Sequence, residues 1–190
     1  MVTLLRLASL LAAAGIASSA QAELKFTPTI SEYELDGIKL QQLAFSDDGK
    51  TVTYQPPRGW SYSGDATQLR LHPKDKSQAE ATITRIPRPR AQALDEEGIK
   101  TLVAEALATI PQGSENVSVL SQEKNPIMIQ QKETLLVTLR YTIYGQHYAR
   151  SILFLYRGNE QIRAQLTCSE PDFGALQRAF FASQYSWQNL

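Results

Sequence analysis

The chain has 190 residues, and its 19 lysines and arginines balance 19 aspartates and glutamates. This length fits one domain with a sizeable core, and a net charge near zero argues against nucleic acid as the main partner. A single cysteine, Cys168, excludes an intramolecular disulfide, so packing alone must hold the fold together.

The first 22 residues have the pattern of a secretory signal peptide. Arg6 gives a positive start, an apolar run follows, and Ala20-Gln21-Ala22 places small side chains where a signal peptidase reads them. The run is shorter than the about 20 residues that a membrane-spanning helix needs. We therefore expect cleavage after Ala22 and an exported, soluble protein, periplasmic or secreted, with no stable membrane anchor. Residues 23–190 are expected to form a single domain.

Alternating apolar residues predict strands through the first half of this domain. A turn at Asp47-Asp48-Gly49 joins the second strand to the third, because Gly tolerates the positive φ of a tight hairpin. Pro56-Pro57 ends the third strand, since proline cannot donate to the ladder. The predicted strands of this half are residues 24–30, 38–45, 51–55, 68–71 and 79–86.

The clearest helix follows a proline-rich break at residues 87–90. From Ile99 to Ile110, apolar residues recur at steps of three and four and build one stripe. Asp95 and the two glutamates after it lie where the helix dipole favours negative charge, and Pro111 stops the pattern. The spacing predicts a helix over residues 95–110.

Three strands with short turns are predicted over residues 135–143, 147–156 and 162–168. The connections are too short for parallel crossovers, which predicts an antiparallel meander. A last helix is predicted over residues 171–184, with Ser169 as its cap, and Trp187 is expected to fold onto the sheet. The predicted class is α+β: an antiparallel, meander-rich sheet packed with two main helices, whose faces the sequence leaves open.

Two segments carry a family resemblance. The first is residues 53–60, Thr-Tyr-Gln-Pro-Pro-Arg-Gly-Trp, where a strand ends in prolines and a Gly-Trp pair. The second is at the C-terminal end, where a predicted helix follows Phe154-Leu155-Tyr156 and Leu166-Thr167-Cys168-Ser169 and ends before Ser186-Trp187. Together with the order of elements, they resemble the PsbP-like α/β/α sandwich domains, which include exported bacterial proteins and extrinsic photosystem II subunits. The resemblance implies a mostly non-catalytic accessory, assembly or binding role. No metal- or partner-binding residue of the photosystem proteins has a clear match.

Residues with catalytic potential are few. His72 and His147 are the only histidines, and both are expected at strand ends on the surface. Cys168 falls on the apolar side of its strand, which favours core packing over a nucleophilic role. A zinc site would need three or four His, Cys or acidic ligands, and no two of these His and Cys residues lie at metal-ligand spacing. We therefore predict no catalytic residue, metal or cofactor; Asn116 begins a glycosylation sequon whose use the sequence leaves open.

Three candidate binding residues lie on three successive predicted strands: Arg140, Arg150 and Arg163. On a shared sheet face they would suit a carboxylate or phosphate group. The alternative is a solvated face balanced by Glu133 and Glu160.

The other candidates lie in loops. Arg88 and Arg90 form a proline-rich basic stretch that either docks a partner or is a stiff connector. Trp60, with Tyr62, either anchors a partner or closes one end of the core, and the family layout favours burial.

The leading hypothesis is a non-enzymatic exported accessory or binding protein, whose protein partner or small ligand is unidentified. Two alternatives stay open. One is a small-ligand carrier with a cavity between sheet and helices, lined by residues such as Tyr141 or Phe154. The other is a hydrolase that uses His147 or His72.

Overall fold

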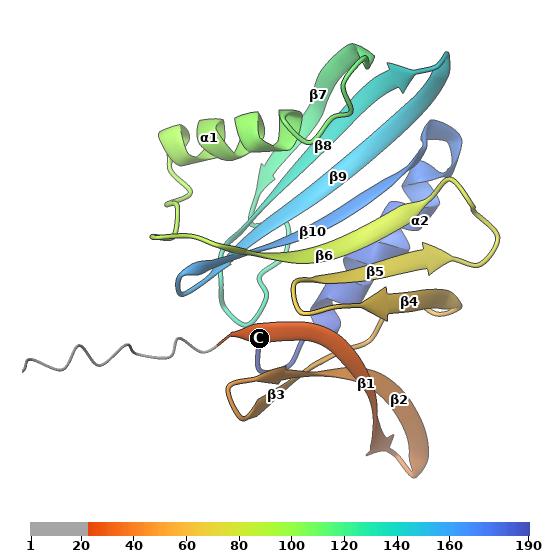
Figure 1. Ribbon diagram of the computed structural model, residues 1–190, viewed down its shortest axis with the longest axis vertical. Helices are drawn as coiled ribbons and strands as arrows, with labels where there is room; N and C mark the ends of the chain where they lie inside the picture. The colour runs from red at the N-terminus through yellow and green to blue at the C-terminus, as the bar shows by residue number, and fades with distance from the viewer. Residues whose placement is uncertain (1–22) are drawn as a thin grey trace, which may run out of the picture.

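The computed structural model describes residues 23–190, which form two antiparallel sheets and two α-helices (Figure 1). The predicted signal peptide, residues 1–22, lies outside the described residues. β1 (Leu24–Leu35), β2 (Ile38–Asp47) and β3 (Lys50–Tyr54) form the small sheet in sequence order. The large sheet has the order β4 (Trp60–Gly64), β5 (Gln68–Pro73), β6 (Glu80–Pro87), β10 (Glu160–Ser169), β9 (Gln146–Arg157), β8 (Thr134–Ile143) and β7 (Glu115–Lys124).

The predicted α+β class and the C-terminal meander are confirmed. β8, β9 and β10 are neighbours in the sheet and pair antiparallel throughout. The β2–β3 turn also forms as predicted, with positive φ at Asp48 and Gly49. β6 pairs with β10, although 72 residues (88–159) separate the two strands in the sequence. This intervening segment contains α1, β7, β8 and β9.

The two helices lie close to their predicted positions. α1 (Glu96–Leu107) starts at Asp95, whose carboxylate accepts a hydrogen bond from the backbone N–H of Gly98 at 2.8 Å. α2 (Glu170–Ser183) is followed by a short 3₁₀ helix, Gln184–Ser186. Ser169 stands at the start of α2 but does not cap a backbone N–H; its hydroxyl donates to Asp172 Oδ2 at 2.9 Å.

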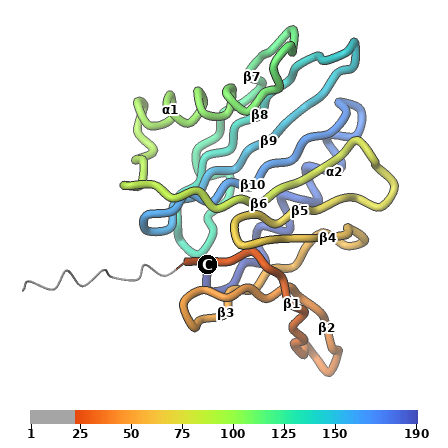
Figure 2. The backbone as a smooth tube through the Cα atoms, viewed as in Figure 1, coloured from red at the N-terminus to blue at the C-terminus, as the bar shows by residue number. Residues whose placement is uncertain are grey.

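The helices cover opposite faces of the large sheet, and Figures 1 and 2 show α2 behind it. On one face, Leu102 of α1 belongs to a core cluster with Val137 and Phe154. On the other, Phe180 of α2 shares a core with Leu153 and with the small sheet. Each face therefore has its own apolar core, and these contacts settle which helix covers which face.

The C-terminal segment locks onto the small sheet, as predicted for Trp187. Its ring stacks on Tyr54 with centroids 4.4 Å apart. Gln188 then forms a two-way backbone bridge with Thr53 of β3. The end of the chain therefore fastens the small sheet to α2.

Two strands were missed by the sequence analysis. β4 covers residues that the prediction left in the turn after Pro57, because its side chains are almost all exposed and give no apolar alternation. β7 has almost no buried side chain, so its sequence lacks the period-two apolar pattern of a half-buried strand. Each is an edge strand of the large sheet, where one side has no partner strand.

Candidate functional site

The three candidate arginines of the meander do not form one site. Arg140 lies on the α2 face and is exposed, with Nη1 3.6 Å from Glu170 Oε1. Arg150 and Arg163 lie on the α1 face, but four residues apart in the β9–β10 register. The shared carboxylate or phosphate site therefore has no basis in this arrangement.

Arg150 is a buried structural residue. Its Nε donates to Thr167 Oγ1 at 2.8 Å, and Nη1 donates to the carbonyl and the hydroxyl of Thr109. Thr109 follows the C-terminus of α1, where the helix dipole favours a cation. Burial lowers the pKa of Arg150, with the nearby Tyr141 opposing that effect. Arg150 thus fastens the end of α1 to the sheet.

Arg163 and Arg88 share one carboxylate. Glu105 of α1 accepts from Arg88 Nη2 at 2.6 Å and from Arg163 Nη2 at 3.1 Å, and Gln161 joins both guanidinium groups. Burial lowers the pKa of Arg163, while Glu105 opposes the shift. The stiff-connector interpretation fits Arg88, which ties the proline-rich segment to α1; Arg90 is exposed beyond it.

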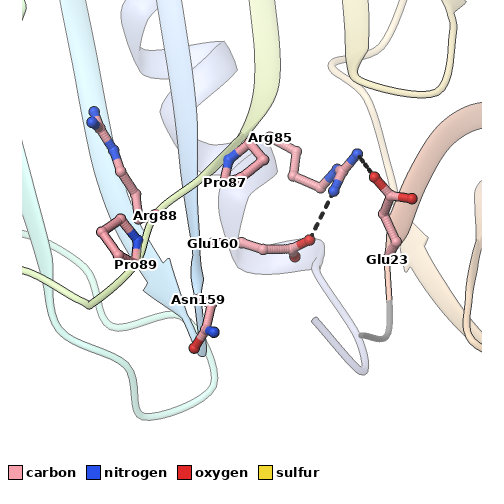
Figure 3. A pocket seen from close by; sticks show the side chains of 7 residues that line it. All are labelled: Glu23, Arg85, Pro87, Arg88, Pro89, Asn159 and Glu160. Atoms are coloured by element: carbon pink, nitrogen blue, oxygen red, sulfur yellow. Dashed lines mark hydrogen bonds and ion pairs between the residues drawn. The ribbon is translucent and has the colours of Figure 1, made fainter. Parts of the chain in front are cut away.

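A charged hollow of about 540 Å³ lies beside this segment (Figure 3). Arg85 Nη1 donates to Glu160 Oε1 at 3.0 Å, and Nη2 pairs with Glu23. Burial acts to lower the pKa of Arg85, but the bonds to Glu160 and Glu23 outweigh it and raise the pKa. Arg88 also lines the hollow, but its guanidinium points away from Glu160 and Glu23 and pairs with Glu105 instead (Figure 3). Both arginines of the hollow are therefore already paired with carboxylates.

The pairs of this hollow continue inward as a chain of charges. Glu160 also binds Arg157 Nη1 at 3.2 Å, and Arg157 pairs with Asp47, which is 3% exposed, at the end of β2. These ion pairs therefore link the start of β1 and the end of β2, in the small sheet, to β6, β9 and β10 of the large sheet. Their role is to hold the two sheets together.

A second hollow, of about 650 Å³, lies between the β1–β2 hairpin and the start of β4. We call it the Trp60 groove. Its lining includes Tyr33, Lys39, Pro56, Arg58, Trp60 and Tyr62. Of the residues that the structure describes, no Asp or Glu lines this groove.

The sequence left two roles open for Trp60, a partner anchor or a part of the core, and the structure shows features of both. It is partly buried, and its ring stacks on Phe180 of α2 with centroids 6.1 Å apart. Tyr62, two residues along β4, is 38% exposed. Trp60 therefore has one face fixed by the core while it also lines the groove.

Gln55, which also lines the Trp60 groove, is held in place by the 3₁₀ helix at the end of the chain. Gln55 donates from its backbone N–H to Ser186 Oγ at 2.8 Å, and from its side chain to the hydroxyl of Tyr33. Tyr33, Lys39 and Arg58 were not singled out by the sequence analysis. Arg58 lies inside the Pro-Pro-Arg-Gly-Trp segment, but Tyr33 and Lys39 lie on a hairpin some twenty residues earlier, and no local pattern links them to Trp60.

The histidines lie apart from both hollows. His72 and His147 are exposed, and the one side-chain bond of His147 joins its Nδ1 to Thr142 Oγ1 at 3.0 Å. Within residues 23–190, neither ring contacts a carboxylate. The hydrolase hypothesis thus lacks the acid it needs beside the histidine.

Cys168 lies in the core as predicted. It is 1% exposed, and burial raises the pKa of its thiol to about 12, which keeps it protonated and unreactive at neutral pH. In the described part of the chain, no group of three or more His, Cys, Asp and Glu side chains is placed to hold a metal ion.

The two residues that the carrier hypothesis named as cavity lining are packed in the core instead. Phe154 is 1% exposed and has the guanidinium of Arg163 over its ring at 5.4 Å. Tyr141 is 2% exposed and stacks on Tyr148. Neither residue lines the charged hollow or the Trp60 groove.

Comparisons with known proteins identify the fold. No family model matches this chain, and no curated protein matches it. The solution structure of cyanobacterial PsbP from Synechocystis sp. PCC 6803 is similar with a TM-score of 0.52 and 14% identity, over 94% of this chain and 98% of that one. A Pseudomonas aeruginosa protein of unknown function is similar with a TM-score of 0.45 and 14% identity, over 83% of this chain and 94% of that one.

At 14% identity, the likeness to cyanobacterial PsbP shows the fold alone. Across residues 23–190, neither helix has the length and apolar character needed to cross a bilayer. The order of strands, the two helices on opposite faces and the likeness to cyanobacterial PsbP agree with the resemblance read from the sequence. The chain has a PsbP-like fold.

Proposed function

We propose that the protein is an exported, non-enzymatic binding protein, and that it binds its partner in the Trp60 groove. The observation that carries the proposal is the lining of the groove, where aromatic rings and two cations meet in one open hollow. Aromatic side chains beside polar groups are typical of binding sites, because they combine a large apolar surface with fixed geometry.

The charged hollow supports binding less well. Its arginines are already engaged by Glu23, Glu160 and Glu105. A ligand would have to displace ion pairs that hold the sheets and α1 together, and removing one partner of a buried pair is costly. A ligand in the Trp60 groove would displace no ion pair, since Lys39 and Arg58 form none among the described residues.

Export rests on the first 22 residues. The predicted cleavage after Ala22 leaves Glu23 as the first residue, and β1 begins at the next residue, Leu24, which is fully buried. N-terminal sequencing of the protein from its native host tests this part; an intact residue 1 would contradict it.

Photo-crosslinking tests the groove as the binding site. A photoreactive phenylalanine at position 62 reports on the groove, and the same residue at position 144 is the matched control, since Tyr144 is 96% exposed and far from the groove in sequence and fold. In the native host, we expect a discrete adduct from position 62 and none from position 144. Equal labelling from both positions, or no adduct from position 62, would refute the groove as the site.

A further inference from the structure

The Trp60 groove lies between two strands that have no partner on their outer side. β4 ends the large sheet, and β1 ends the small one. The two sheets approach each other at Gly64, where the backbone oxygen of Phe26 lies so close that a Cβ would clash with it. From that junction, β4 leads to Trp60 and β1 leads to Tyr33, which line the groove.

Unpaired strand edges offer a specific kind of recognition. No other strand pairs with the outer edge of β4. The N–H of Trp60 donates to the carbonyl of Pro57 and Gly64 lies against Phe26 of β1, so the open part of this edge is the stretch between them. An extended peptide can pair with such an edge, while pockets beside it accept its side chains. The rings of Tyr33, Trp60 and Tyr62 supply apolar surface for those side chains.

The charge of the groove selects among peptides. Lys39 and Arg58 are exposed and line it, and the groove has no carboxylate. Lys39 stands opposite Glu34 in the β1–β2 register but forms no ion pair with it. The groove therefore has two cations available for a ligand, and charged groups of a partner are most favourable where they meet the opposite sign.

We propose that the Trp60 groove binds an extended acidic segment of a partner protein, which pairs with the free edge of β4 and places its carboxylates near Lys39 and Arg58. The inference rests on the proposed function and adds the chemistry of the partner. A compact ligand without a peptide backbone would leave the edge of β4 unused.

A display library of random peptides of about twelve residues tests this chemistry, because its result does not depend on guessing one sequence. The purified protein should enrich acidic peptides over the starting pool. The Lys39→Glu/Arg58→Glu variant should instead enrich basic peptides, since both cations become carboxylates. The matched control, Lys74→Glu/Lys100→Glu, makes the same charge change at two exposed sites outside the groove and should still enrich acidic peptides.

Affinities of the best acidic peptides then give a quantitative check. Lys39→Gln/Arg58→Gln should weaken binding by about tenfold or more, and raising the salt should weaken it further. Tyr62→Ala should also weaken binding, while Tyr144→Ala should not. The proposal is overturned if no acidic peptide is enriched, if the charge-reversed variant still prefers acidic peptides, or if dextran sulfate binds in the groove while no peptide does.

The two proposals can fail separately. A crosslink from position 62 together with non-acidic selected peptides would keep the groove as the binding site and reject the acidic segment. The absence of that crosslink together with acidic peptides that ignore Lys39 and Arg58 would reject both.

Discussion

Trp60 and Phe180 stack with their ring planes 7° apart, which joins an edge strand of the large sheet to the helix behind it. The contact fixes one face of Trp60 from inside the protein. The position of the groove wall is therefore set by the same core that stabilises α2.

This contact predicts that two neighbouring aromatic residues differ in their effect on stability. Trp60→Ala removes the stack and leaves a gap beside Phe180, so we expect a loss of about 2 kcal/mol in the free energy of unfolding. Tyr62→Ala removes a ring that is 38% exposed, so we expect a change within about 0.5 kcal/mol. Urea denaturation of both variants measures the difference, and equal losses would show that the stack does not matter.

Two of the candidate arginines should also differ. Arg150→Gln leaves the carbonyl of Thr109 and two hydroxyls without their donor, and we expect a loss of about 2 kcal/mol. Arg140→Gln removes an exposed pair with Glu170 and should cost less than about 0.5 kcal/mol. Hydrogen exchange should show faster opening of α1 in the Arg150 variant alone. Unchanged α1 protection would contradict the fastening role of Arg150.

The junction between the sheets depends on the absence of a side chain at Gly64. Gly64→Ala would press a Cβ against the backbone of β1, so we expect a loss of about 2 kcal/mol or more. Gly174→Ala is the matched control: the nearest atom to its new Cβ is the end of Arg178 at 3.7 Å, and alanine favours a helix by about 0.5 to 1 kcal/mol. Thermal unfolding should move in opposite directions for the two variants; a neutral Gly64→Ala would mean that the sheets do not meet there.

Cys168 makes the stability of the fold depend on alkaline pH. Burial raises the pKa of its thiol from 9.0 to about 12, so the unfolded chain loses this proton first. The stabilising effect is complete below pH 9 and is lost as the pH rises from 9 to 12. At a pH of about 10 the loss is about 1.4 kcal/mol relative to neutral pH.

The comparison variant for this effect is Cys168→Ala, which carries a packing loss that does not change with pH. The difference in unfolding free energy between wild type and variant should therefore shrink above pH 9. A constant difference from pH 7 to pH 11 would contradict the raised pKa.

The sequence predicted the parts of the fold that have strong periodicity. The stripe from Ile99 to Ile110 and the alternation in β8 and β10 each reflect burial of one defined face, and both were placed correctly. β7 was missed because it buries almost nothing, so its sequence does not record its pairing with β8.

The candidate site was harder to predict for a related reason. Trp60 was found because a tryptophan beside prolines is conspicuous in the sequence. Tyr33 and Lys39, which line the same groove, lie on the β1–β2 hairpin. That hairpin approaches Trp60 only through tertiary packing, which local sequence patterns do not show. Arg140, Arg150 and Arg163 were grouped by strand order, but strand order does not say which face each side chain occupies. Residue parity within the observed register separates them.

The chain of charges between the sheets starts at Glu23, next to the fully buried Leu24. If the leader is removed after Ala22, the peptidase must act on a bond two residues from the core, and endopeptidases need their substrate accessible and unpacked. Cleavage would then have to come before β1 docks. In that order of events, the peptidase acts on an N-terminus that is still unpacked, and Glu23 pairs with Arg85 only afterwards.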